Sequence, residues 1–173
     1  MLLRSLTPCV ALLGSILPVT GARAQTAERT YTNPVYHWVI AYPSGWAVDS
    51  QNVAFVLITP PSSLVEGVVG IHTGAVSFTT VDELVDALVG SQQASGQSVR
   101  ILSRRNVQLV DSVPAIELET ELGVGTIGRS RRLFVLREGT AYVIDAETYR
   151  DSWAVIEPYV ARIIQSFRIR RTP

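Results

Sequence analysis

The sequence contains one cysteine, two histidines and no lysine among its 173 residues. Cys9 is the single cysteine, and it lies in an N-terminal segment that we expect to be removed. The mature chain would then have no disulfide and no reactive thiol. Zinc sites need cysteine or histidine ligands, and the His-Glu-x-x-His pattern is absent. We therefore expect no metal centre, no cofactor and no thiol chemistry.

The charges are balanced, which excludes a broad class of partners. Fifteen arginines oppose fifteen acidic residues, so the formal net charge is zero. Removing residues 1–24 leaves 13 arginines and the same 15 acids, a formal charge near −2. Binding to nucleic acid or to an anionic membrane surface requires a basic excess. We therefore expect no nucleic-acid partner.

The first 24 residues have the pattern of a secretory signal peptide. Arg4 precedes a mostly apolar run over residues 6–19, which is short for a membrane span. The small residue Ala24 completes a cleavage pattern, so Gln25 is the expected mature N-terminus. An uncleaved anchor helix is the alternative. No lipidation motif surrounds Cys9. The sequence predicts an exported, non-lipidated protein, periplasmic or extracellular, with no membrane span in the mature chain.

The remaining chain reads as a flexible leader over 25–33, a single domain over 34–169 and a tail over 170–173. Hydrophobic residues make up 47% of the chain, enough for a core. Residues 39–48 read as a strand, a turn and the start of a second strand, which we expect to form the first edge of a sheet. Further strands are indicated by alternation or by short apolar runs. They lie at 53–59, 68–76, 99–110 (with a bulge near 104–105), 115–122, 131–137 and 141–146.

Two segments instead have helical spacing. Apolar residues recur every three or four positions from Thr80 to about residue 94, and Glu83 completes a capping-box pattern. A second apolar stripe runs over 153–167, where Pro158 requires either a kink or a later helix start. The prediction is an α+β fold, with an antiparallel sheet of about six or seven strands and helices packed on its faces.

The order of these elements resembles the PsbP-like family. The matching features are Tyr42-Pro43-x-Gly45-Trp46, Val113-Pro114-Ala115, a hairpin over 132–145 and the C-terminal helix over 153–167. Members of the family include extrinsic photosystem subunits, a Ran-binding nuclear import factor and bacterial secreted proteins of unknown role. The resemblance covers residues 31–169. It implies an α/β/α sandwich, no shared catalytic residue and an accessory or binding role.

His37 and His72 are the only candidate imidazole bases. A Ser-His-Asp site needs a base that is oriented by an acid and in contact with a nucleophile. No Gly-x-Ser-x-Gly turn is present to position a serine. We expect both histidines to be structural or to lie at the surface, and we predict no catalytic residue. A hydrolase with an unrecognised site is a less favoured alternative.

An acidic row, Glu117, Glu119 and Glu121, alternates with apolar residues along one predicted strand. Carboxylates in a row can bind a divalent cation. The favoured interpretation is cross-strand pairing with arginines on a solvated face. Whether this row binds a cation stays open.

The segment 123–128 contains three glycines and superficially matches a dinucleotide fingerprint. That fingerprint requires a helix after it, whereas a strand follows here, so we expect a flexible loop. Arg129, Arg131 and Arg132 beside it are the best candidates for contact with an anionic ligand or a partner.

The sequence as a whole favours an exported, non-enzymatic binding or accessory domain. We expect it to dock on an extracytoplasmic or membrane-associated protein through a sheet edge or loop face. The alternative is a carrier of small apolar ligands, with a pocket between sheet and helix lined by Phe55, Leu84 or Ile163. The identity of the partner and the oligomeric state stay open.

Overall fold

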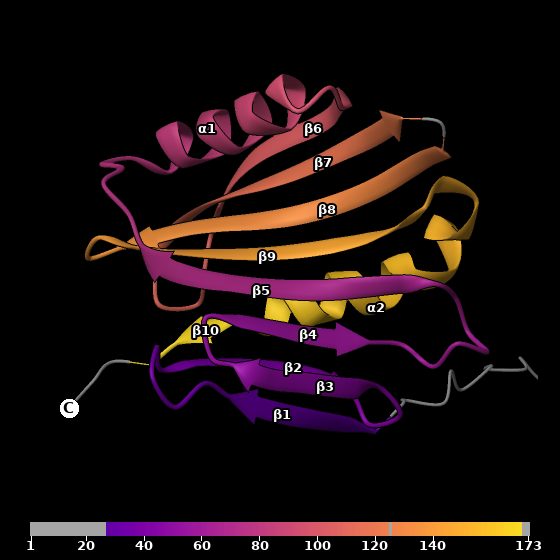
Figure 1. Cartoon of the computed structure of the whole chain (residues 1–173). Coiled ribbons are helices and arrows are strands. Elements are labelled where there is room, and N and C mark those ends of the chain that lie inside the picture. Colours follow the sequence, from indigo (N-terminus) through magenta and orange to yellow (C-terminus); the bar gives the residue numbers. More distant parts are fainter. Residues whose placement is uncertain (1–26, 125, 171–173) are drawn as a thin grey trace, which may run out of the picture.

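The computed structural model describes residues 27–124 and 126–170. These residues form ten strands, one 3-10 turn and two α-helices (Figure 1). The elements are β1 (Glu28–Thr32), β2 (Trp38–Pro43), β3 (Ala47–Asn52), β4 (Phe55–Thr59), β5 (Gly67–Ala75), α1 (Val81–Ala94), β6 (Ser98–Gln108), β7 (Pro114–Val124), β8 (Thr126–Arg137), β9 (Thr140–Tyr149), η1 (Arg150–Ser152), α2 (Trp153–Ser166) and β10 (Arg168–Ile169).

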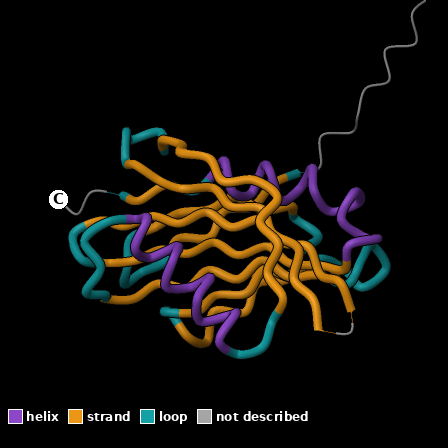
Figure 2. The backbone as a smooth tube through the Cα atoms, turned by 90° about the horizontal axis from the view of Figure 1, so that it is seen from above, coloured by secondary structure: helices purple, strands orange, loops and turns teal. Residues whose placement is uncertain are grey.

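The strands form two antiparallel sheets. The large sheet has seven strands in the order β3-β4-β5-β9-β8-β7-β6, and the small sheet has the order β1-β2-β10. Helix α1 covers one face of the large sheet over β6, β7 and β8. Helix α2 packs on the opposite face and also against β2 of the small sheet (Figures 1 and 2). The fold class is therefore the predicted α+β arrangement.

Each face of the large sheet has its own hydrophobic core. The larger core lies on the α2 side and contains Trp38, Trp153 and Phe167. The smaller core lies under α1 and contains Val85 and Phe134. Because side chains alternate along a strand, neighbouring residues of β8 belong to different cores.

Several local predictions are confirmed. The side chain of Thr80 accepts a hydrogen bond from the Glu83 N–H, and the Glu83 carboxylate accepts one from the Thr80 N–H, so α1 begins with a full capping box. The turn between β8 and β9 places Glu138 at φ 51° and Gly139 at φ 73°. Two positive φ angles are what a tight two-residue hairpin of this kind requires.

The predicted leader is wrong over the part that the structure describes. Residues 28–32 form β1, which pairs with β2, and Tyr31 packs on Trp38 with ring centroids 5.3 Å apart. The sequence did not indicate this strand, because its residues are mostly polar and exposed. Backbone pairing at a sheet edge does not require alternating apolar residues. Residues 1–24, with the proposed Ala24–Gln25 cleavage site, lie outside the described residues.

The stretch 39–48 does not form one sheet edge. Strand β2 belongs to the small sheet, and β3 belongs to the edge of the large one. The Trp46 N–H donates to the Pro43 carbonyl, which closes the turn between them, and the Trp46 ring packs 5.8 Å from that of Tyr159 on α2. The turn therefore links the two sheets around α2.

Smaller differences concern three element boundaries. Helix α2 begins at Trp153 and runs through Pro158, so the helix starts before the proline. The bulge of β6 falls between Ile101 and Ser103 rather than at Arg104-Arg105. Strand pairing reaches Val124 and Thr126, where a flexible loop was expected. No helix in the described part of the chain is long and apolar enough to cross a bilayer.

Candidate partner-binding face

The outer strands of the large sheet present a ladder of charged side chains on the α2 side. Helix α2 packs on β2, β9 and β8, while β6 is one of the two edge strands of the large sheet. We call this surface the outer charged face. It consists of Arg100 and Arg105 on β6, Glu117, Glu119 and Glu121 on β7, and Arg129 and Arg131 on β8.

Each glutamate of the central strand is paired with arginine. Glu121 pairs with Arg100, and Glu117 pairs with Arg105. Glu119 accepts from Arg131 Nη2 at 2.5 Å and from Arg129 Nη2 at 3.2 Å. The predicted cross-strand pairing is confirmed. Among the residues that the structure describes, no group of three potential ligands forms a metal site.

The inner end of this face is anchored on α2. The guanidinium carbons of Arg129 and Arg131 lie 5.3 Å and 5.9 Å from the Trp153 ring centroid. Arg131 Nη1 also pairs with Glu157 Oε1 at 3.0 Å. Burial raises the pKa of Glu119, but hydrogen bonds and charge from Arg131 and Arg129 outweigh it and hold the pKa below its usual value. The inner arginines are therefore fixed in place and the carboxylate stays ionised.

The outer end is the part open to solvent. The side chains of Arg100 and Arg105 are 66% and 58% exposed, whereas those of their partners Glu121 and Glu117 are only 14% and 13% exposed. The guanidinium groups thus form the outermost layer, and the carboxylates lie beneath them. An approaching molecule first meets positive charge.

Arg132 lies on the other side of the sheet. Its side chain is 1% exposed, with Nε 2.9 Å from Asp145 Oδ1 and Nη1 donating to Gln92 of α1 at 2.8 Å. Neither Arg132 Nε nor Asp145 Oδ1 forms an aligned hydrogen bond, although the two atoms are close. The structure therefore brings Arg129 and Arg131 together and separates Arg132 from them.

Sequence reasoning missed Arg100 and Arg105. The alternation of β7 places Glu117, Glu119 and Glu121 on one face, and the antiparallel register then brings Arg100 opposite Glu121 and Arg105 opposite Glu117. The bulge between Ile101 and Ser103 shifts the alternation by one, which puts both arginines on the same face despite their odd spacing.

The two histidines lie in different places. His37 lies in the β1–β2 loop, and His72 lies on β5 with its ring 4.3 Å from that of Phe55. Burial lowers the pKa of His72, with Asp145 and Arg132 acting in opposite directions. The described residues show no hydrogen bond between His72 and Asp145, and the buried Ser130 hydroxyl is engaged with Thr120 at 2.8 Å. This geometry does not assemble a hydrolase triad.

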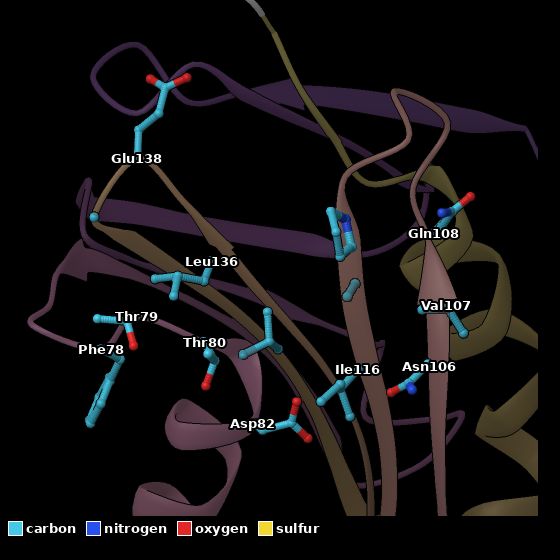
Figure 3. A pocket seen from close by; sticks show the side chains of 14 residues that line it. Phe78, Thr79, Thr80, Asp82, Asn106, Val107, Gln108, Ile116, Leu136 and Glu138 are labelled. Carbon is cyan, nitrogen blue, oxygen red and sulfur yellow. The ribbon is translucent and has the colours of Figure 1, made fainter.

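A cavity with a volume of about 980 Å³ lies at the start of α1. Figure 3 shows Asp82 and Leu136 beside it, between the helix, the β6–β7 strands and the β8–β9 turn. The residues expected to line a carrier pocket lie elsewhere. Leu84 and Ile163 are buried in the two cores, and Phe55 is on β4.

Comparison with known proteins supports the fold. No family model and no curated protein matches the sequence. The structure is similar to cyanobacterial PsbP (CyanoP) from Synechocystis sp. PCC 6803, with a TM-score of 0.65, 15% identity, and coverage of 91% of this chain and 99% of that one.

Two further solved structures are similar. One is a Pseudomonas aeruginosa protein of unknown function, described as a putative regulator, with a TM-score of 0.60, 16% identity, and coverage of 84% of this chain and 99% of that one. The other is from Bacteroides thetaiotaomicron, with a TM-score of 0.56, 11% identity, and coverage of 83% of this chain and 48% of that one. At these identities the likeness concerns the fold, and the chain has the PsbP-like fold.

Proposed function

We propose that this protein is an exported, non-enzymatic accessory domain that docks on an extracytoplasmic or membrane-associated protein through the outer charged face. Export rests on the signal-peptide pattern of residues 1–24. The main supporting observation is the layered arrangement at the sheet edge, where Arg100 and Arg105 lie exposed above half-buried glutamates.

Arginine is suited to this role. Its planar guanidinium can keep a bond to the glutamate beneath and offer further N–H groups outward to a partner carboxylate. Arginine is also enriched among the residues that dominate binding energy at interfaces. We therefore infer that the partner presents an acidic segment to β6.

The free edge of β6 adds backbone groups to the same surface. The strand spans Ser98–Gln108, is the last strand of the large sheet, and contains a bulge. Bulges and charged side chains protect such an edge from unspecific strand pairing. Recognition then depends on charge matching, which favours one acidic partner over general aggregation.

The test is crosslinking in the native cell on a C-terminally tagged protein, followed by mass spectrometry. The proposal predicts a mature chain that begins at Gln25 and one abundant envelope protein attached to it. The double variant R100Q/R105Q should lose most of this adduct. R104Q is the matched control, since Arg104 lies on the same strand but pairs with Asp82 and Asp86 of α1. Equal loss in both variants would contradict the proposal.

A ligand carrier is the second candidate, supported by the 980 Å³ cavity at the start of α1. Apolar Leu136, Ile116 and Phe78 lie beside polar Asn106 and Gln108 in its lining, a composition typical of small-molecule sites. Native mass spectrometry of the exported protein should then detect a bound small molecule. Leu136→Trp would fill the cavity and abolish that mass shift. A ligand-free protein that crosslinks to a partner would reject the carrier function.

A further inference from the structure

Three segments that are distant in sequence meet at one end of the molecule, away from the outer charged face. They are the β1–β2 loop, the β8–β9 hairpin and the end of β10, which lie together on the left of Figure 1. A cavity of about 420 Å³ opens between them. Its lining includes His37, Arg137, Tyr142, Tyr36 and Arg170.

The loop that holds His37 is rigidly built. Asn33 is fully buried, and its side-chain oxygen accepts from the N–H groups of Val35 and Tyr36 at 3.0 Å and 2.9 Å. The Asn33 side-chain amide donates to the Val53 carbonyl at 2.7 Å. This anchoring keeps His37 at φ 55°, a left-handed conformation that a non-glycine residue adopts at a cost.

The same loop positions a second basic residue. The backbone N–H of Arg170 donates to the His37 carbonyl at 2.8 Å, which holds the end of β10 against the loop. The third basic residue, Arg137, comes from the end of β8, beside the tight turn. Backbone contacts therefore fix the Cα positions of His37, Arg137 and Arg170.

The charges in this cavity are mainly positive. Arg137 and Arg170 are opposed in the lining by a single carboxylate, Glu138, whose side chain is 84% exposed and lies 3.4 Å from Arg137 Nε. An ion pair this exposed contributes little to stability and can be replaced by another anion. The cavity thus has basic groups available in a concave space.

Two phenols complete the lining. Burial raises the pKa of Tyr142, with Arg137 acting in the opposite direction, so its hydroxyl is a neutral donor at physiological pH. Among the hydrogen bonds of residues 27–124 and 126–170, none engages the hydroxyl of Tyr36 or Tyr142. Both are free to donate to a ligand.

We propose that this cavity binds a phosphate-type oxyanion, held by Arg137, Arg170 and His37 and by the hydroxyls of Tyr36 and Tyr142. Donors from three segments suit a compact tetrahedral anion better than a flat carboxylate. Arginine forks match phosphate oxygens with two parallel hydrogen bonds. The site lies apart from the proposed docking face, so the phosphate site and the docking function can each be disproved without the other.

Isothermal titration calorimetry of the mature protein with inorganic phosphate and with acetate tests this assignment. Phosphate should bind and acetate should not. R137Q and R170Q should each weaken phosphate binding by about tenfold or more, the usual loss for a charge-assisted hydrogen bond. R29Q is the matched control, because Arg29 is an exposed arginine of β1 outside the cavity, and it should bind phosphate as the wild type does.

His37→Gly separates binding from folding. Glycine accepts the left-handed conformation without cost, so the variant should fold at least as stably as the wild type while phosphate binding falls. A stable H37G variant with unchanged phosphate affinity would overturn the role of the imidazole. Equal weakening by R29Q, or no phosphate binding at millimolar concentration together with no arginine-dependent vesicle binding, would overturn the site.

Vesicles distinguish the source of the phosphate group. Flotation with phosphatidylglycerol but not phosphatidylcholine vesicles, lost in R137Q and R170Q, would assign the site to a lipid headgroup. Phosphate binding without flotation would assign it to free phosphate or a soluble phosphomonoester. Both results support an oxyanion site at this end of the molecule.

Discussion

Arg131 and Arg132 are neighbours on β8, yet they lie in opposite environments. Arg131 is on the α2 side, between Glu119, Glu157 and the Trp153 ring. Arg132 is on the α1 side, 1% exposed, between Asp145 and Gln92. Arg131 belongs to a charged network that continues to the surface, whereas Arg132 is buried and donates a hydrogen bond to α1. Two residues that are adjacent in a strand can therefore have different roles, because their side chains lie on opposite faces of the sheet.

The two environments also differ in what surrounds the charge. On the α2 side, carboxylates and arginines alternate across three strands, so each charge has several partners. On the α1 side, Arg132 and Asp145 depend mainly on each other and lack an aligned hydrogen bond. A network tolerates the loss of one member better than an isolated buried pair.

The largest loss of stability should come from replacing Trp153, the ring on which the arginines of the α2-side network pack. Trp153 is 5% exposed and packs under both Arg129 and Arg131. Trp153→Ala should lower the free energy of unfolding by about 3–5 kcal/mol, through lost burial and the cavity left behind. Urea unfolding measures this. A loss below about 1 kcal/mol would show that Trp153 is not a core residue.

The next largest effect concerns the buried pair. Arg132→Met should cost about 2–3 kcal/mol, because it leaves Asp145 partly buried without its cation. The value is below the usual range for a fully buried pair, since the Asp145 side chain is 24% exposed. In the double variant R132M/D145M much of the stability should return. A double variant less stable than R132M would contradict this explanation.

Two glutamates should respond to pH with opposite signs. The pKa of Glu119 is lowered, so its contribution to stability is present above the unfolded value of about 4.3 and is lost as pH falls through the folded pKa. Burial, and then Asp145, raise the pKa of Glu147, while Arg132 opposes them. Ionisation of Glu147 therefore costs stability as pH rises from about 4.3 through its folded pKa.

Urea unfolding between about pH 3 and 8 tests these signs. Compared with the wild type, E119Q should lose stability at neutral pH and less of it in acid. The free energy of unfolding of E147Q should increase relative to that of the wild type as pH rises. The gain should be small, because Glu147 is only partly buried and solvent screens its charge. The same sign for both variants would contradict the contrast between the two faces.

The smallest effect is expected at Arg104. It pairs with Asp82 at 2.5 Å and with Asp86 at 3.0 Å, but those two side chains are 68% and 70% exposed. R104Q should cost no more than about 1 kcal/mol in urea unfolding, as exposed ion pairs usually do. A larger loss would mean that α1 is held mainly by charge rather than by Val85 and its apolar neighbours.

Much of the large sheet and both helices could be predicted from local sequence. The capping box at Thr80, the Glu138-Gly139 turn and the alternation around Glu117 and Glu119 are local signals, and each has a direct physical reading. Strand β1 could not be predicted in this way, because its residues are polar and its partner β2 is selected by the tertiary fold.

The candidate site was predicted only in part. The glutamate row and its pairing with arginine were found, and Arg129 and Arg131 lie on that face. Arg132 was grouped with them although alternation alone places it on the opposite face. Arg100 and Arg105 required the register of β6 and the position of its bulge, which the sequence does not specify.

One measurement tests the docking face most directly. A photo-crosslinking residue at Ser103, which lies opposite Glu119, should capture one envelope protein in the native cell, through an acidic segment identified by mass spectrometry. The same residue at Thr30 on β1 is the control. We expect an adduct at position 103 that disappears in R100Q/R105Q, and no adduct at position 30. No adduct at 103, or the same adduct from both positions, would contradict the proposed docking face.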